Sequence, residues 1–256
     1  MAVRPWLSVI VPAYNEERRI ATTLGAIRDY LGRQGYESEI IVVDDGSADA
    51  TVAVAEGALT GFPQSRVISY RPNRGKGFAV RRGFAETRGE MVLFTDADLS
   101  TPIEEIERAI PIAQAGHDIV VGSRASGDTV RVRQPLFRQF AARFFNLARD
   151  FLVGNGGVVD SQCGFKLFRG DVGRDIFARQ RVDRFMFDSE TLFIARRLGY
   201  SFIEMPVAWA DQPGSKVRVI RGALELFPEL LSIRLRHGGL RRTNGEVGAS
   251  RDRTTA

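Results

Sequence analysis

The stretch MVLFTDADLSTP at residues 91–102 decides how this chain is interpreted. Its first five residues form an apolar run typical of a buried strand. Asp96 and Asp98 follow, so two carboxylates stand at the carboxyl end of that strand, where an open α/β sheet holds its ligand. Carboxylates this close can bind a Mg²⁺ or Mn²⁺ ion whose other ligands are water and a substrate diphosphate. An acidic turn can also arise by chance, so the interpretation depends on other motifs.

Two earlier stretches repeat the pattern of an apolar strand that ends in polar residues. VIVPAYNEE at 9–17 begins as a strand that stops at Pro12, and Asn15-Glu16-Glu17 then opens an amphipathic helix. VVDDGSAD at 42–49 ends a second strand, over 39–43, in two aspartates and a glycine that permits a tight turn. Strand, tight loop and helix in this order are typical of a nucleotide-binding half.

A third stretch, NRGKGFAVRRG at 73–83, is a glycine-rich basic start to a helix. Free backbone N–H groups at a helix start, together with positive charge, suit a phosphate. The stretch is neither a Walker loop nor a G-x-G-x-x-G fingerprint, because position 80 is valine.

The rest of the chain predicts an α/β fold with a mainly parallel central sheet flanked by helices. Further strands are expected near residues 66–69, 91–95, 118–122, 164–168 and 202–207, and further helices near 75–87, 103–115 and 189–198. Strands and helices alternate in the first half, whereas the second half supplies shorter, partly antiparallel pieces that would close over the site.

In order and spacing, these stretches resemble the family-2 inverting glycosyltransferases with the GT-A fold, and more narrowly the polyprenyl-phosphate (dolichyl-phosphate) β-glucosyltransferases. The matching stretches span most of residues 7–220: VIVPAYNEE, VVDDGSAD, NRGKGFAVRRG, TDADLSTP, VGSR at 121–124 and DSQCGFKLFR at 160–169. The first four indicate nucleotide-sugar transfer, and the last resembles the glucosyl branch. The resemblance implies a GT-A catalytic domain over residues 1–220.

The resemblance also implies a reaction, the inverting transfer of a hexose from a nucleotide sugar to a polyprenyl phosphate. The expected donor is UDP-glucose, and the expected acceptor is dolichyl or undecaprenyl phosphate. Asp98 would bind Mg²⁺ or Mn²⁺, with Asp96 as a second metal ligand or a ribose contact. The other donor-binding residues implied are Pro12, Ala13, Tyr14, Glu16 and Asp45 for base and ribose, and Lys76 for the phosphates.

Three basic residues would compensate the charge of phosphate groups: Arg124, Lys216 and Arg218. Gln162 is a further acceptor-binding candidate. Asp188 matches the position where related enzymes carry a general base. A lipid monophosphate has a second pKa of about 6, however, so it is largely ionised and already nucleophilic at neutral pH. Asp188 could therefore orient the substrates, or it could simply cap the helix expected from Ser189.

Composition narrows the compartment and the partners. The chain has 256 residues, 44% of them apolar, so it can bury a sizeable core. One cysteine, Cys163, and two histidines argue against a disulfide framework and a structural zinc site, so we expect a cytosolic location and a packing role for Cys163. No apolar run reaches the roughly 18 residues needed to span a bilayer, and no cleavable signal pattern is found. The chain is expected to be peripheral on the cytosolic face of a membrane.

The net charge of +5 could suggest nucleic acid, but the positive charge is concentrated beside aromatic residues, so we expect no nucleic-acid partner. Between residues 124 and 149 there are six arginines against one aspartate. The phenylalanine-rich stripe over 136–153 suits either a helix in a membrane interface or a core-facing helix with a solvated basic face. The family resemblance favours the membrane. Residues 221–242 predict a second amphipathic basic helix suited to anionic lipids, which Pro228 should start or kink, and 243–256 predict a disordered tail.

Other functions stay open at this point. A soluble family-2 transferase could use the same donor site with a non-lipid acceptor, and a mannosyl enzyme would take GDP-mannose. A sugar nucleotidyltransferase normally carries its glycine-rich signature directly after the first strand, where this chain has PAYNEE. A non-catalytic sensor is disfavoured by the intact Asp96, Asp98 and Asp188.

Overall fold

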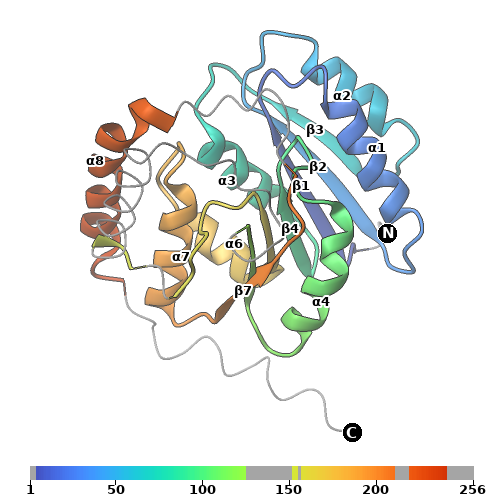
Figure 1. Cartoon of the computed structure of the whole chain (residues 1–256). Helices are drawn as coiled ribbons and strands as arrows, with labels where there is room; N and C mark the ends of the chain where they lie inside the picture. The colour runs from blue at the N-terminus through green and yellow to red at the C-terminus, as the bar shows by residue number, and fades with distance from the viewer. Residues whose placement is uncertain (1–3, 125–151, 155–156, 211–218, 241–256) are drawn as a thin grey trace, which may run out of the picture.

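The computed structural model of the chain describes residues 4–124, 152–154, 157–210 and 219–240 (Figure 1). The elements follow in the order β1 (Leu7–Ala13), α1 (Ile20–Leu31), β2 (Ser38–Asp44), α2 (Thr51–Leu59), β3 (Ser65–Ser69), α3 (Lys76–Glu86), β4 (Met91–Thr95), the 3₁₀ turn η1 (Ile103–Glu105), α4 (Ile106–Gln114), β5 (Ile119–Ser123), β6 (Phe165–Arg169), α6 (Gly170–Arg179), α7 (Phe187–Leu198), β7 (Phe202–Pro206) and α8 (Val219–His237).

These strands form one seven-stranded sheet in the order β3-β2-β1-β4-β6-β5-β7. Strands β1, β2, β3 and β4 pair in parallel, as do β5 and β7, whereas β6 runs antiparallel to both β4 and β5. The predicted mainly parallel sheet with antiparallel pieces in the second half is confirmed. Because β1 pairs with β2 on one side and β4 on the other, the chain reverses its strand order at β1, and ligands bind at the carboxyl ends of strands around such a point.

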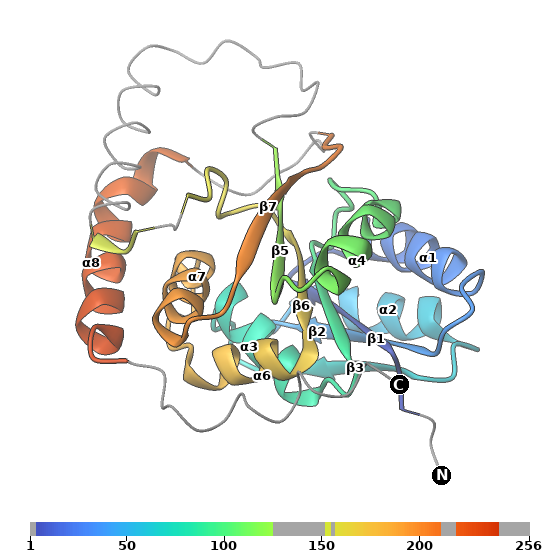
Figure 2. The same cartoon turned by 90° about the horizontal axis from the view of Figure 1, so that it is seen from below.

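Strand residues alternate between two apolar layers that cover the two faces of the sheet (Figure 2). Val9 and Val11 of β1 face the layer that contains α1, α2 and α4. Ile10, between them, faces the layer that contains α3, α6 and α7. Helix α8 packs on α7 at the outside of this second layer, through Leu230 and Ile233. Both faces of the sheet are therefore covered by helices. A ligand can reach the sheet only at its edges, and the loops at the carboxyl ends of the strands form one of them.

Several element bounds differ from the predicted ones. Helix α1 begins at Ile20, because Asn15 adopts a positive φ of 53° and the residues after it form turns. Helix α6 was not predicted, since its glycines weaken helix propensity. At Gly173, however, an added Cβ would lie 2.5 Å from the ring of Phe84, so close helix packing requires glycine there. Helix α8 continues through Pro228 and does not start at it.

Some predictions fall on parts of the chain that the structure does not describe. The expected interface helix over 136–153 lies outside the described residues, except for its last two positions. Lys216, Arg218 and the predicted tail over 243–256 lie wholly outside them. None of the described helices has both the length and the apolarity needed to cross a bilayer.

Candidate active site

The loops after β1 and β2 are joined to each other at the carboxyl edge of the sheet. The backbone N–H of Asn15 donates to Ser47 Oγ over 2.8 Å, and that of Glu16 donates to Thr51 Oγ1 over 2.7 Å. The positive φ of Asn15 suits asparagine, which tolerates the left-handed region better than most residues. The predicted donor-binding stretch at 12–16 therefore has a backbone path that the neighbouring loop holds in place.

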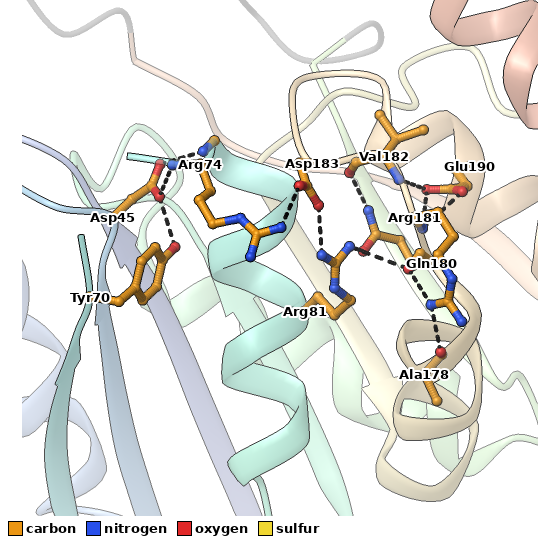
Figure 3. A network of polar contacts seen from close by, with 11 residues as sticks. Asp45, Tyr70, Arg74, Arg81, Ala178, Gln180, Arg181, Val182, Asp183 and Glu190 are labelled. Carbon is orange, nitrogen blue, oxygen red and sulfur yellow. Dashed lines mark hydrogen bonds and ion pairs between the residues drawn. The ribbon is translucent and has the colours of Figure 1, made fainter. Parts of the chain in front are cut away.

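Asp45 holds the glycine-rich loop that leads into α3 (Figure 3). Its buried carboxylate accepts four hydrogen bonds of 2.7–2.8 Å, from Tyr70 Oη, Asn73 Nδ2 and the backbone N–H groups of Arg74 and Gly75. Burial and the hydrogen bond to Asp45 both raise the pKa of Tyr70. A loop tied at four points presents its remaining N–H groups in a fixed direction, as phosphate binding requires. The predicted contact of Asp45 with the donor stays a prediction.

Asp183 braces the same loop from the opposite side (Figure 3). Its carbonyl accepts a hydrogen bond from the N–H of Phe78, and its carboxylate pairs with Arg81 at 2.6 Å and Arg74 at 3.2 Å. Gly75 has a φ of 111°, and an added Cβ would lie 2.5 Å from the Asp183 carbonyl oxygen. The loop therefore requires glycine at 75 for both its conformation and its clearance. Sequence reasoning missed Asp183, because no motif marks it.

Lys76 and Asp96 form an ion pair between the start of α3 and the end of β4. Lys76 Nζ lies 2.5 Å from Asp96 Oδ1, and the two side chains are 26% and 34% exposed. Burial lowers the pKa of Lys76, but the carboxylates of Asp96, Asp188 and Asp98 together outweigh it and hold that pKa above its usual value. At Gly164 an added Cβ would lie 1.9 Å from Asp96 Oδ2, so the carboxylate rests directly on a glycine backbone. A phosphate could therefore bind Lys76 while a cation that arrives with it binds Asp96.

Asp98 follows in the loop and is partly exposed. Its Oδ1 accepts a hydrogen bond from the N–H of Ser100 over 3.0 Å, and Leu99 between them has a φ of 49°. Within the described parts of the chain, no group of three or more histidine, cysteine, aspartate or glutamate side chains is arranged to hold a metal ion. The predicted binding of a divalent ion by Asp96 and Asp98, with water and a diphosphate as the other ligands, stays a prediction.

Asp188 belongs to a second lysine–carboxylate pair, which is buried. Lys166 in β6 is 1% exposed, and its Nζ lies 2.5 Å from Asp188 Oδ1 and 2.7 Å from the carbonyl of Cys163. Burial raises the pKa of Asp188, while the ammonium groups of Lys166 and Lys76 oppose this. The expectation that Asp188 caps a helix is wrong: α7 begins at Phe187, so Asp188 lies inside its first turn. Lys166 had no role assigned from sequence, because lysine in a strand is ordinarily solvent-exposed.

Arg124 at the end of β5 is held by a bidentate pair with Asp160. The Nε–Oδ2 and Nη2–Oδ1 distances are 2.6 and 2.8 Å. Burial raises the pKa of Asp160, but the Arg124 hydrogen bonds outweigh it and keep that pKa below its usual value. Nearby, Gln162 donates to the carbonyl of Phe185 over 3.3 Å. Arg124 therefore faces any phosphate with part of its charge already compensated.

The remaining predicted residues can now be placed. Pro12 and Ala13 are buried in β1, Tyr14 beyond them is 42% exposed, and Glu16 pairs with Arg19 at 2.7 Å. Cys163 is buried in the core and burial raises the pKa of its thiol, which confirms its predicted packing role. The described site thus brings the loops after β1, β2 and β4 together with the start of α3.

Comparison with known proteins agrees with this geometry. Residues 8–177 match the family described as glycosyl transferase family 2. Dolichyl-phosphate beta-glucosyltransferase of Trichomonas vaginalis is 36% identical over 245 residues, which are 91% of this chain and 74% of that protein. The Mus musculus protein of the same name is 37% identical over 245 residues, covering 90% of this chain and 75% of the relative.

Solved structures are similar in fold at lower identity. Glucosyl-3-phosphoglycerate synthase from Mycobacterium tuberculosis, solved with Mn²⁺, UDP and phosphoglyceric acid, superposes with a TM-score of 0.61 at 21% identity, covering 93% of this chain and 80% of its own. Mannosyl-3-phosphoglycerate synthase from Rubrobacter xylanophilus gives a TM-score of 0.65 at 20% identity, covering 95% and 78%. The predicted fold class is confirmed.

Proposed function

This chain belongs to glycosyltransferase family 2, and from that premise we propose that it transfers glucose from UDP-glucose to dolichyl or another polyprenyl phosphate, with inversion at the anomeric carbon. Support for this acceptor and sugar comes from the similarity to dolichyl-phosphate beta-glucosyltransferases over about nine-tenths of the chain. The observation that supports the donor site most directly is the Lys76–Asp96 pair. It joins the start of α3 to the loop after β4, which also contains Asp98.

The donor diphosphate is proposed to bind where the glycine-rich loop meets the end of β4. Asp98, with Asp96 as second ligand or ribose contact, would hold a Mg²⁺ or Mn²⁺ ion, which neutralises charge on the leaving diphosphate when bound. Lys76 would leave Asp96 for the phosphates. Both side chains are partly exposed, so this exchange costs little desolvation.

In the chemical step, an acceptor phosphate oxygen attacks the anomeric carbon from the face opposite the diphosphate. The new C–O bond forms as the bond to the diphosphate breaks, and the electron pair leaves with UDP. Lys76, which would contact the same phosphates in the bound donor, compensates part of that negative charge. The acceptor phosphate, with a pKa of about 6, requires no proton removal. Asp188, bonded to Lys166, therefore suits orienting the substrates better than general base catalysis.

The lipid acceptor implies contact with a membrane, and α8 supplies a surface for it. On this helix Leu230, Ile233 and His237 are buried. Leu231 and Leu235, 41% and 75% exposed, lie on the outward face. Arg234 and Arg236 flank that face, both exposed. An apolar stripe edged by arginines suits the interface of a membrane with anionic lipids, which we place on the cytosolic side.

One assay tests donor, acceptor and membrane together. The purified protein is incubated with Mg²⁺, radiolabelled UDP- and GDP-sugars, and liposomes with or without a polyprenyl phosphate. We expect label in the organic phase only with UDP-glucose and the lipid phosphate. Label from GDP-mannose instead would overturn the donor, and donor hydrolysis without labelled lipid would indicate a soluble acceptor.

A further inference from the structure

A surface pocket lies apart from the donor site, between the C-terminal ends of α6 and α8. It is shallow and open, with a volume of about 460 Å³, and is lined by Arg179, Arg181, Arg236, His237 and Leu240. Its lining is basic and aromatic on most sides and apolar at one.

Two arginines of this pocket, Arg181 and Arg236, have no acidic partner among the residues that the structure describes. Arg179 pairs with Asp175, and His237 contacts Glu190 at 2.6 Å. Among residues that the structure describes, the Arg181 guanidinium donates only to backbone carbonyls, and no ion pair is found for Arg236. Both arginines are exposed. An anion could therefore bind between them without first displacing a carboxylate.

The buried contact beneath the pocket fixes how its two walls face each other. Glu190 in α7 accepts hydrogen bonds from the N–H groups of Arg181 and Val182 and contacts His237 at the end of α8. One buried carboxylate thus ties the segment after α6 to the end of α8 (Figure 3 shows the α6 side). Arg181 and Arg236, which adjoin its partners, are held across the same opening.

The chemistry of the pocket fits a phosphate group. Guanidinium groups bind phosphate oxygens in a bidentate manner, and two of them can share one phosphate. The volume exceeds that of a single phosphate, so a glycerol unit attached to it has room. Arg236 follows Leu235 directly, and Leu235 is the most exposed apolar side chain of the outward face of α8. A lipid whose chains rest on that face would place its headgroup in the pocket.

We propose that this pocket binds the phosphate headgroup of an anionic membrane lipid and so holds α8 on the membrane surface. The proposal rests on the membrane contact in the proposed function. It adds a specific headgroup site to a general electrostatic attraction.

The test uses the full chain and a double variant, Arg181→Gln with Arg236→Gln. A double variant with the same charge change, Arg33→Gln with Arg108→Gln, serves as control. Both of these arginines are exposed, and they lie just after α1 and within α4, respectively. Binding is measured by cosedimentation with vesicles of phosphatidylcholine alone or mixed with phosphatidylglycerol. We expect the pocket variant to lose about 30-fold in affinity for the mixed vesicles, as two arginines near an anionic surface imply, and the control to lose less than about threefold.

Two further readings separate the outcomes. If both double variants lost vesicle affinity equally, the overall charge of the protein, and not the pocket, would account for binding, and the proposal would be overturned. Calorimetry with glycerol phosphate and inorganic phosphate tests a free anion: binding that the pocket variant abolishes, with unchanged vesicle affinity, would overturn the lipid assignment. Transfer to detergent-dispersed polyprenyl phosphate should be unchanged in both variants. If the wild-type protein makes no labelled lipid but the pocket variant loses vesicle affinity as expected, the proposed function fails and the headgroup site stands.

Discussion

Two lysine–carboxylate pairs lie in the site with the same 2.5 Å separation but in different surroundings. Lys76 and Asp96 are 26% and 34% exposed, whereas Lys166 and Asp188 are 1% and 6% exposed. The open pair joins the first residue of α3 to the loop after β4, and the closed pair joins β6 to α7 in the core. Equal distances therefore do not imply equal roles.

Solvent decides what each pair can do. An exposed ion pair contributes only about 0–1 kcal/mol, so a ligand can separate it cheaply. Removing one partner of a buried pair costs about 3–5 kcal/mol, because the other charge is left without compensation. The open pair is thus suited to exchange its partners for a diphosphate and a metal ion, and the closed pair is suited to hold Asp188 in one position. Four variants test this difference.

The largest effect is expected at Asp98, the acid beside the open pair. Asp98→Ala should lower transfer by about a thousandfold, since metal-assisted charge stabilisation contributes several kcal/mol. Unfolding stability should change by less than about 1 kcal/mol, because the side chain is partly exposed and makes one hydrogen bond within the described residues. Transfer assays and thermal unfolding measure the two quantities. Substantial transfer without Asp98 would refute a metal site at the end of β4.

Lys166→Met should break the closed pair and destabilise the fold by about 3–5 kcal/mol. The acidic limb of its pH–rate profile should also move to higher pH, because burial raises the pKa of Asp188 and the main opposing charge is gone. Denaturant unfolding and pH-dependent turnover provide the measurements. A matched control, Lys166→Met with Asp188→Leu, removes both charges. It should recover most of the stability but not the activity, and recovery of both would make the pair purely structural.

Lys76→Met should affect donor binding more than stability, the opposite of what is expected for Lys166→Met. We expect a change in stability below about 1 kcal/mol, with a roughly tenfold rise in KM for the nucleotide sugar, as the loss of one charged hydrogen bond of about 1.5 kcal/mol implies. Lys76→Arg should restore part of the affinity. Titration of UDP with and without Mg²⁺ checks the phosphate contact directly. A large loss of stability with unchanged donor binding would show that Lys76 belongs to the fold and not to the site.

How far these roles can be predicted depends on where their signals lie in the chain. The place of Asp96 and Asp98 at the end of a buried strand was predictable from the apolar run before them, whereas their metal role stays a prediction. Lys166 was not, since β6 is covered on both faces and only tertiary packing reveals that its lysine is buried. Asp183 was likewise hidden, because its contacts to Arg74 and Arg81 join segments about 100 residues apart, which local patterns do not record.

A smaller loss of stability than at the closed pair is expected at a third pair, Arg124–Asp160, whose side chains are 38% and 12% exposed. Asp160→Asn should cost about 1–2 kcal/mol at neutral pH, less than the closed pair because Arg124 keeps solvent contact. The folded-state pKa of Asp160 is below its usual value of 3.8, so its contribution is present above that pH and is lost as the pH falls below it. Wild-type and variant stabilities, measured by denaturant unfolding, should therefore begin to converge below about pH 4 and meet only below the folded-state pKa of Asp160. A difference that persists undiminished in acid would mean that packing, not charge, holds Asp160, and exposure would then cease to rank the three pairs.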